Sequence, residues 1–95
     1  MNFAMFPTDK GVSVSPFVAK ITEVIRSKGF ENQLTAMGTL VETETLDEAL
    51  GLINDTYSAI EMDCNRVYVS VNIDIKKGSS GRIKSKVDSV EQKLK

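Results

Sequence analysis

The stretch V-Y-V-S-V-N-I-D-I, residues 67–75, decides the fold that the sequence predicts. Aliphatic residues alternate strictly with more polar ones, and this period of two is typical of a β-strand with one apolar and one polar face. We therefore predict a long strand over residues 67–75. Its polar face would carry Tyr68, Ser70, Asn72 and Asp74.

A helix and a hairpin are predicted upstream of this strand. Thr45-Leu46-Asp47-Glu48 has the spacing of a capping box, and the apolar residues after it keep a helical period to about Met62. Before this helix, segments 33–36 and 39–43 are rich in β-forming residues and are joined through Met37-Gly38. This pattern predicts a hairpin.

The N-terminal part begins with a strand and a helix. Residues 2–6 are almost wholly apolar, as expected for a central strand covered on both faces. The apolar spacing from Phe17 predicts an amphipathic helix that Gly29 ends. We expect Ser15 to be its N-cap and Pro16 its first residue.

The predicted order of elements, β-α-β-β-α-β, indicates an α+β fold, the ferredoxin-like sandwich with two helices on one face of an antiparallel sheet. A flexible turn at 76–81 would lead to an additional C-terminal helix at 82–95, whose apolar residues recur every three or four positions. The whole chain, 1–95, is expected to form a single domain, because it is too short for a second core.

Such a sandwich leaves one face of the sheet without helices. That face would combine part of the apolar first strand with the polar row of residues 67–75, which makes it too apolar for water and too polar for a dry core. We therefore expect self-association through this face, with cavities where polar residues meet.

Composition narrows the possible classes of function. Hydrophobic residues make up 41% of the chain, as in soluble globular proteins, and no apolar run approaches the roughly 18 residues of a membrane span. The N-terminus resembles a strand more than a signal peptide, so a cytoplasmic location is expected. Histidine is absent and Cys64 is the only cysteine. This argues against a metal site, a cysteine nucleophile and an internal disulfide.

Charge is divided unevenly along the chain. Residues 1–75 carry five Lys/Arg against eleven Asp/Glu, whereas residues 76–95 carry seven against two. The acidic body favours cationic ligands. The basic segment 76–86 is interpreted as a solvated tail or a subunit contact, ahead of a phosphate or RNA site, because strand 67–75 lacks the paired stacking aromatics of an RNA-recognition strand. Its basic residues are Lys76, Lys77, Arg82, Lys84 and Lys86.

Three groups of residues are candidates for a binding site, and each also has a structural explanation. Two serines would bring hydroxyls to the N-terminus of a helix, although serine there is more often only a cap. A Gly-Thr-x-x-Glu element offers close backbone approach, a hydroxyl and a carboxylate, although a strand glycine more often marks a turn. The polar row of residues 67–75 would bind a flat cationic ring, although such a face is usually solvated. The candidates are Ser13, Ser15, Gly38, Thr39, Glu42, Tyr68, Asn72 and Asp74.

Three motifs together carry a family resemblance: G-V-S-V-S-P-F-V-A at 11–19, L-T-A-M-G-T-L-V-E at 34–42 and K-S-K-V-D-S-V-E-Q-K-L at 84–94. In their order and spacing the chain resembles the small thiamine-binding protein family. The resemblance implies a ferredoxin-like fold with an extra C-terminal helix, dimers pairing into a homotetramer, and binding of thiamine or its hydroxymethylpyrimidine part without catalysis.

Thiamine joins a cationic thiazolium to an aminopyrimidine, so its site needs a carboxylate or aromatic face and a set of hydrogen-bonding groups. Glu42, Asp74 and Tyr68 are the candidates for the first ring, and the remaining hydroxyl and amide groups for the second. Thiamine would be a ligand at a pocket between subunits, with no cofactor and no nucleic-acid or membrane partner. The alternatives are an interaction module without a small ligand, and an enzyme whose proton transfers would fall to the same three residues.

Overall fold

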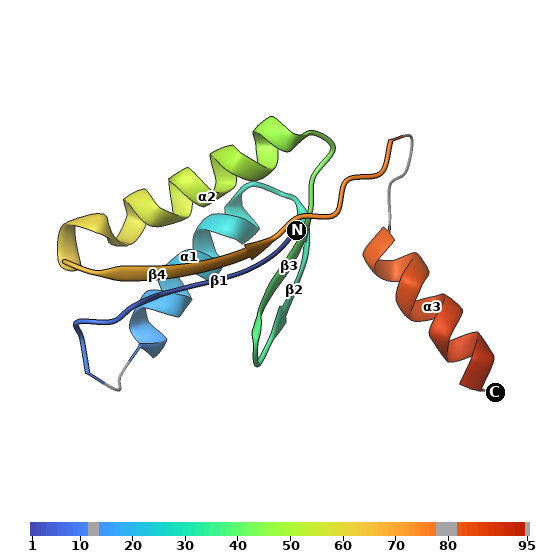
Figure 1. Cartoon of the computed structure of the whole chain (residues 1–95), viewed down its shortest axis with the longest axis horizontal. Coiled ribbons are helices and arrows are strands. Elements are labelled where there is room, and N and C mark those ends of the chain that lie inside the picture. Colours follow the sequence, from blue (N-terminus) through green and yellow to red (C-terminus); the bar gives the residue numbers. More distant parts are fainter. Residues whose placement is uncertain (12–13, 78–81, 95) are drawn as a thin grey trace.

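Four strands form one antiparallel sheet, and two helices cover one of its faces (Figure 1). The computed structural model describes residues 1–11, 14–77 and 82–94. The elements in chain order are β1 (Asn2–Pro7), α1 (Ser15–Ser27), β2 (Glu31–Thr35), β3 (Gly38–Glu42), α2 (Leu46–Ile60), the short 3-10 helix η1 (Glu61–Asp63), β4 (Val67–Asn72) and α3 (Arg82–Leu94). The predicted ferredoxin-like α+β sandwich with an extra C-terminal helix is confirmed.

The sheet has the strand order β2-β3-β1-β4, so the apolar first strand is central and β2 and β4 are the edges. Phe3 pairs with Thr39 of β3 and with Val71 of β4. Directly paired residues lie on the same face of a sheet, so all three side chains lie on the face that the helices cover. Because strand residues alternate between faces, Glu42 and Asn72 lie on the other, open face.

The core lies between this sheet and the two helices. Its buried residues come from the helix-facing positions of β1 and β3 and from one stripe of each helix. They are Phe3, Met5, Ile21, Ile25, Val41, Leu52 and Ile60. On α2 the expected apolar face is only partly right, because Leu46, Leu50 and Tyr57 are exposed whereas Leu52 and Thr56 are buried.

The two helices begin differently. Thr45 is the N-cap of α2: its hydroxyl accepts a hydrogen bond from the Glu48 amide at 3.1 Å, and the Glu48 carboxylate accepts from the Thr45 amide at 3.1 Å, so the predicted capping box is confirmed. At α1 the prediction is wrong by one residue, because Val14 is the N-cap and Ser15 already belongs to the helix. Among the described residues, no side chain caps α1; the Val14 carbonyl accepts from the amides of Phe17 and Val18 at 3.0 and 3.1 Å.

The last strand is shorter than its alternating sequence predicts. β4 ends at Asn72, although the alternation continues to Ile75. Asn72 pairs with Asn2, the first residue of β1, so the following residues have no partner in β1. Alternation indicates which face a side chain takes, whereas the neighbouring strand determines where pairing stops.

The open face of the sheet has the mixed character that the sequence predicts. Phe6 and Tyr68 pair across β1 and β4 with their ring centroids 5.5 Å apart, and Ala4 lies opposite Ser70 on the same face. Asp74 lies beyond the end of β4, so the polar row on the strand itself ends at Asn72.

Helix α3 projects from the end of the sheet, where it contacts β3 (Figure 1). It gives the chain an elongated outline of 45 × 30 × 20 Å and a radius of gyration of 14.6 Å. A compact domain of this length has a radius of gyration of roughly 12 Å. Within the described part of α3, Val87, Val90 and Leu94 are all exposed.

Candidate functional site

A cavity of about 440 Å³ opens at the end of the sheet where β3 and β4 both finish. Its lining comes from the end of β3, the turn and first residues of α2, the segment after β4, the start of β1, and Val87 of α3. These strand ends meet because β3 and β4 both run antiparallel to β1, on either side of it. The fold therefore brings together residues that are about 30 positions apart in the chain.

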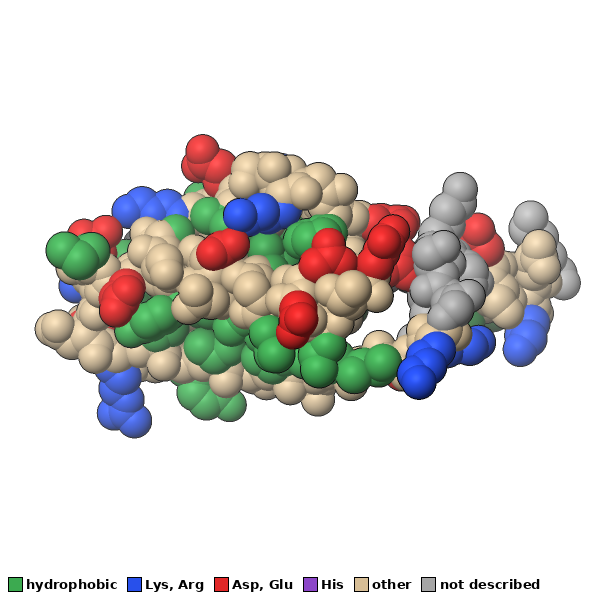
Figure 2. Space-filling model, turned by 90° about the horizontal axis from the view of Figure 1, so that it is seen from above, with side chains coloured by type: hydrophobic (Ala, Val, Ile, Leu, Met, Phe, Trp, Pro, Cys, Tyr) green, Lys and Arg blue, Asp and Glu red, His purple; other side chains and the backbone are tan. Residues whose placement is uncertain are grey.

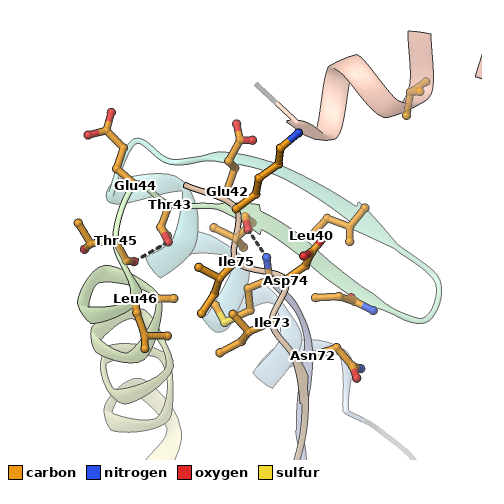
Figure 3. A pocket seen from close by; sticks show the side chains of 16 residues that line it. Leu40, Glu42, Thr43, Glu44, Thr45, Leu46, Asn72, Ile73, Asp74 and Ile75 are labelled. Atoms are coloured by element: carbon orange, nitrogen blue, oxygen red, sulfur yellow. Dashed lines mark hydrogen bonds between the residues drawn. The ribbon is translucent and has the colours of Figure 1, made fainter. Parts of the chain in front are cut away.

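The cavity has apolar walls and an acidic rim. Figure 3 shows Leu46, Ile73 and Ile75 turned toward the middle, with Glu42 and Glu44 on one side and Asn72 on another. Three carboxylates line it, those of Glu42, Glu44 and Asp74, together with the cationic side chain of Lys76. The apolar walls of such a cavity could pack against a flat ring, and the carboxylates at its edge could interact with a positive charge.

Part of the rim is held by a network of hydrogen bonds at the start of α2. One carboxylate oxygen of Glu48 accepts from the amides of Glu44 and Thr45, each at 3.1 Å. The Thr43 hydroxyl donates to the Thr45 carbonyl at 2.9 Å. These bonds fix the backbone of the turn between β3 and α2, so this wall of the cavity is formed before any ligand arrives.

Like charges face each other next to the cavity. Glu31 of β2 pairs directly with Glu42 of β3, and the two lie on the same face of the sheet. These paired acidic residues add negative charge beside the cavity, whose lining also includes the cationic groups of Lys76 and the Met1 ammonium.

Three of the eight sequence candidates line this cavity: Glu42, Asn72 and Asp74. They come from the Gly-Thr-x-x-Glu element and from the polar row of residues 67–75. The structure thus joins two motifs that the sequence could treat only separately.

Other candidates lie toward the opposite end of the sheet. Tyr68 is four residues before Asn72 on β4, about 13 Å along the strand. Ser15 lines a shallow groove between α1 and Leu34 of β2. Ser13 lies outside the described residues.

Gly38 and Thr39 have structural environments that differ from that of Glu42. A Cβ atom at Gly38 would come within 2.9 Å of the Phe3 carbonyl oxygen, so the close backbone approach there is to β1. Thr39 is buried on the helix side of the sheet, opposite to Glu42, because the two are three positions apart and successive strand side chains alternate between faces. Both remain predicted ligand contacts, and neither lines the acidic cavity.

The loop after β1 is tied to the start of β4 at that opposite end. The Asp9 carboxylate accepts from the Asn65 amide at 2.8 Å, and the Thr8 amide donates to the Arg66 carbonyl at 2.9 Å. The bond from Asn65 is the main reason that the pKa of Asp9 is lowered. The carboxylate thus ties the loop after β1 to the segment before β4.

The sequence reasoning missed the contribution of the β3–α2 turn to the cavity. Thr43, Glu44, Thr45 and Leu46 line it, but the sequence assigned this segment only a capping role. Two signals would have pointed to them: the order of the elements places β3 and β4 on either side of β1, both antiparallel to it, and polar residues follow both strand ends. In sandwiches of this kind, residues after two such strands meet at one edge.

Two other kinds of site find no support in the structure. Within residues 1–11, 14–77 and 82–94, acidic and cysteine side chains form no cluster of three that could hold a metal ion. In the same part of the chain, no helix combines the length and apolar character needed to span a bilayer.

The fold and the sequence both match those of other proteins. The family model described as "Thiamine-binding protein" matches residues 1–91. This chain belongs to the thiamine-binding protein family. The expected family resemblance is therefore confirmed.

Relatives of this thiamine-binding family member are of uncharacterised function. UPF0045 protein MJ1052 of Methanocaldococcus jannaschii is 33% identical over 87 residues, covering 92% of this chain and 86% of the relative. A UPF0045 protein of Methanothermobacter thermautotrophicus is 30% identical over 83 residues, covering 86% of this chain and 84% of the relative.

Solved structures share the fold. The crystal structure of hypothetical protein MJ1052 has a TM-score of 0.84 at 32% identity and covers 95% of this chain and 92% of its own. The domain of unknown function DUF77 from Bacillus cereus has a TM-score of 0.77 at 26% identity, with 90% and 83% covered.

Proposed function

We propose that this member of the family binds thiamine or its hydroxymethylpyrimidine part, without catalysis, and that the acidic cavity at the ends of β3 and β4 contributes the main contacts. The observation that carries the proposal is the meeting of Glu42, Asn72 and Asp74 around apolar walls. The volume of about 440 Å³ lies within the roughly 300–1,000 Å³ range of small-molecule sites.

The two rings of thiamine have different requirements, and the cavity offers groups for both. The thiazolium carries a permanent positive charge, which the carboxylates of Glu42 and Asp74 would balance. The aminopyrimidine has donors and acceptors, for which Asn72 offers an amide. Leu46 and Ile73 would pack against the ring faces.

We also propose that the binding site is completed between subunits, through the open face of the sheet. Phe6 and Tyr68 form an aromatic pair on this face, and Tyr68 is 55% exposed. If two such faces stack about a two-fold axis perpendicular to the strands, the Tyr68 end of one copy lies over the Glu42 end of the other. Tyr68 would then reach the cationic ring beside the carboxylates of the partner copy, within a dimer of dimers.

The alternative is an interaction module whose open sheet face serves assembly alone. The exposed aromatic surface of that face favours this reading as well, because it calls for a partner whether or not a ligand binds. Sedimentation with and without thiamine separates the two readings. Assembly that is unaffected by saturating thiamine, together with no binding heat, would favour the module.

Isothermal titration calorimetry on the full chain tests the proposed ligand directly. We expect saturable heat with thiamine, and binding that is weakened roughly 10- to 100-fold in Glu42→Gln, because a charge-assisted contact is lost. Glu61→Gln is the matched control: it removes a carboxylate at the other end of α2, outside the cavity lining, and should leave affinity unchanged.

Titration of hydroxymethylpyrimidine alongside thiamine indicates which ring dominates. The neutral pyrimidine has no charge for the carboxylates to balance. If it binds as tightly as thiamine, and if Glu42→Gln leaves its affinity unchanged, the carboxylates do not contribute to binding. No heat at millimolar concentrations of either compound would contradict the proposed function.

A further inference from the structure

Negative charge is concentrated in the lining of the acidic cavity and just outside it. The lining holds three carboxylates against two cationic groups, the Lys76 side chain and the Met1 ammonium. Outside the lining, Glu31 is the direct partner of Glu42, and two further acidic residues lie in the first turn of α2. Figure 2 shows acidic side chains gathered at the end of the sandwich that adjoins α3. In the described part of the chain, carboxylates therefore outnumber cationic groups around this cavity.

The start of α2 is the feature beside the cavity that would ordinarily attract a phosphate. A helix N-terminus presents free N–H groups and the positive end of the helix dipole, and phosphates bind there in many proteins. Here the Glu48 carboxylate takes that place, because one of its oxygens accepts from the amides of Glu44 and Thr45, each at 3.1 Å. The Glu48 amide in turn donates to the Thr45 hydroxyl at 3.1 Å. These three donors are thus used within the turn itself.

The charge of the same turn also opposes a phosphate. Asp47 and Glu48 lie in the first turn of α2, and Glu44 comes directly before the N-cap. Acidic side chains at this end of a helix offset the partial positive charge that an anion would otherwise meet. A phosphate group that enters the cavity would therefore meet carboxylates in place of free amides.

Phosphorylation reverses the net charge of the proposed ligand. The thiazolium ring of thiamine carries the positive charge, and the same ring carries the hydroxyethyl group to which phosphate is esterified. A phosphate ester adds about −1.5 to −2 charge at pH 7, so thiamine monophosphate is a net anion. With the thiazolium ring against Glu42 or Asp74, a phosphate on that ring would lie close to the carboxylates of the lining.

We infer that the acidic cavity selects the free alcohol of its cationic ligand over the phosphate ester, and that Glu44 is a residue that determines this specificity. The inference rests on the proposed binding of thiamine and names the chemical form that is bound. Glu44 is suited to the role because its side chain is exposed at the rim, whereas Glu42 is half-buried and Glu48 is engaged by two backbone amides. Its carboxylate would repel an approaching phosphate group.

Calorimetric titration of the full chain with thiamine and with thiamine monophosphate measures this selectivity. The buffer is kept free of divalent cations, because these would bridge the phosphate to the carboxylates. We expect the monophosphate to bind at least about 10-fold more weakly than thiamine, since like charges then face each other. The ratio of the two affinities should shrink between about 0.01 M and about 1 M salt, over which the Debye length falls from about 30 Å to about 3 Å.

Glu44→Lys tests the residue itself. This substitution replaces a carboxylate by an ammonium at the rim and keeps the backbone amide that donates to Glu48, so the monophosphate should gain about 10-fold relative to thiamine. Glu61→Lys is the matched control, because it makes the same change in net charge at the other end of α2, about 22 Å along the helix. It should leave the ratio unchanged. Circular dichroism and thermal melting confirm that each variant is folded.

The possible results separate this inference from the proposed function. Monophosphate that binds as tightly as thiamine, or more tightly, would overturn the inference and leave the proposed function intact; the basic segment 76–86 would then be the candidate for phosphate capture. A preference for thiamine that neither salt nor Glu44→Lys changes would mean that the ester is excluded by its size, and would contradict the role of Glu44. No heat with thiamine itself would contradict the proposed function, and the inference with it.

Discussion

Replacing Thr45 by alanine should destabilise the protein, whereas replacing Ser15 by alanine should not. Both residues have hydroxyl side chains and lie at the start of a helix, and both look like N-caps in the sequence. Only Thr45 accepts a hydrogen bond from the third residue of its helix, at 3.1 Å, and only its amide donates a reciprocal bond to a glutamate carboxylate.

The size of the effect follows from these bonds. Thr45→Ala leaves the Glu48 amide without its acceptor, and loss of such a cap costs about 1 kcal/mol and at most about 2 kcal/mol. For a domain of this size, 1 kcal/mol lowers the melting temperature by roughly 4–8 °C. Ser15→Ala removes no capping bond, so its change in the free energy of unfolding should stay within about 0.5 kcal/mol.

Urea unfolding followed by circular dichroism measures both values, with Thr45→Ser as the control that keeps a hydroxyl at the cap. Thr45→Ser should recover most of the lost stability. If Ser15→Ala costs as much as Thr45→Ala, α1 is capped by its serine after all, and the assignment of Val14 as the N-cap is wrong.

Two further predictions concern the other end of the sheet. Gly38→Val should destabilise the hairpin by at least about 1–3 kcal/mol, because a Cβ atom would lie 2.9 Å from the Phe3 carbonyl oxygen at a φ of +156°; an unchanged urea midpoint would contradict this close packing. The lowered pKa of Asp9 means that its carboxylate stabilises the fold above the pKa of the unfolded chain and loses that contribution as pH falls through the lower folded value. Asp9→Asn should therefore unfold with less dependence on pH below about pH 4 than the wild type does, and identical acid-unfolding curves would show that the bond from Asn65 does not contribute.

Much of the fold could be predicted from local patterns. The capping box at Thr45 located the start of α2, because its two hydrogen bonds depend only on residues three apart. The apolar spacing identified both helices and the buried Ile21 and Ile25 of α1, and the uniform apolarity of residues 2–6 indicated the central strand. These features depend on residues that are close together in the sequence.

The errors and omissions have a common physical origin in tertiary contacts. Ser15 looked like a cap, but Val14 is the N-cap and Ser15 already belongs to the helix. Residues 73–75 alternate like a strand, but β1 offers them no partner. The acidic cavity combines the turn before α2 with the end of β4, and only the order of strands in the sheet makes these segments neighbours.

The candidate residues are divided between the two ends of the sheet, and this division affects how a single copy could bind the ligand. Glu42 and Asn72 share one end with Asp74, and Tyr68 lies about 13 Å away. A single copy therefore presents the carboxylates without the aromatic ring, and the proposed stacking of open faces would supply the ring from a second copy. Tyr68→Ala should then weaken both assembly and thiamine binding, whereas Glu42→Gln should weaken binding alone.

The most direct test is a crystal structure of the full-length protein grown with saturating thiamine. The account predicts density for the ligand against Leu46 and Ile73, with its cationic ring within contact distance of the Glu42 or Asp74 carboxylate. Density beside Ser15 at the opposite end of the sheet, with the acidic cavity free of ligand, would contradict it.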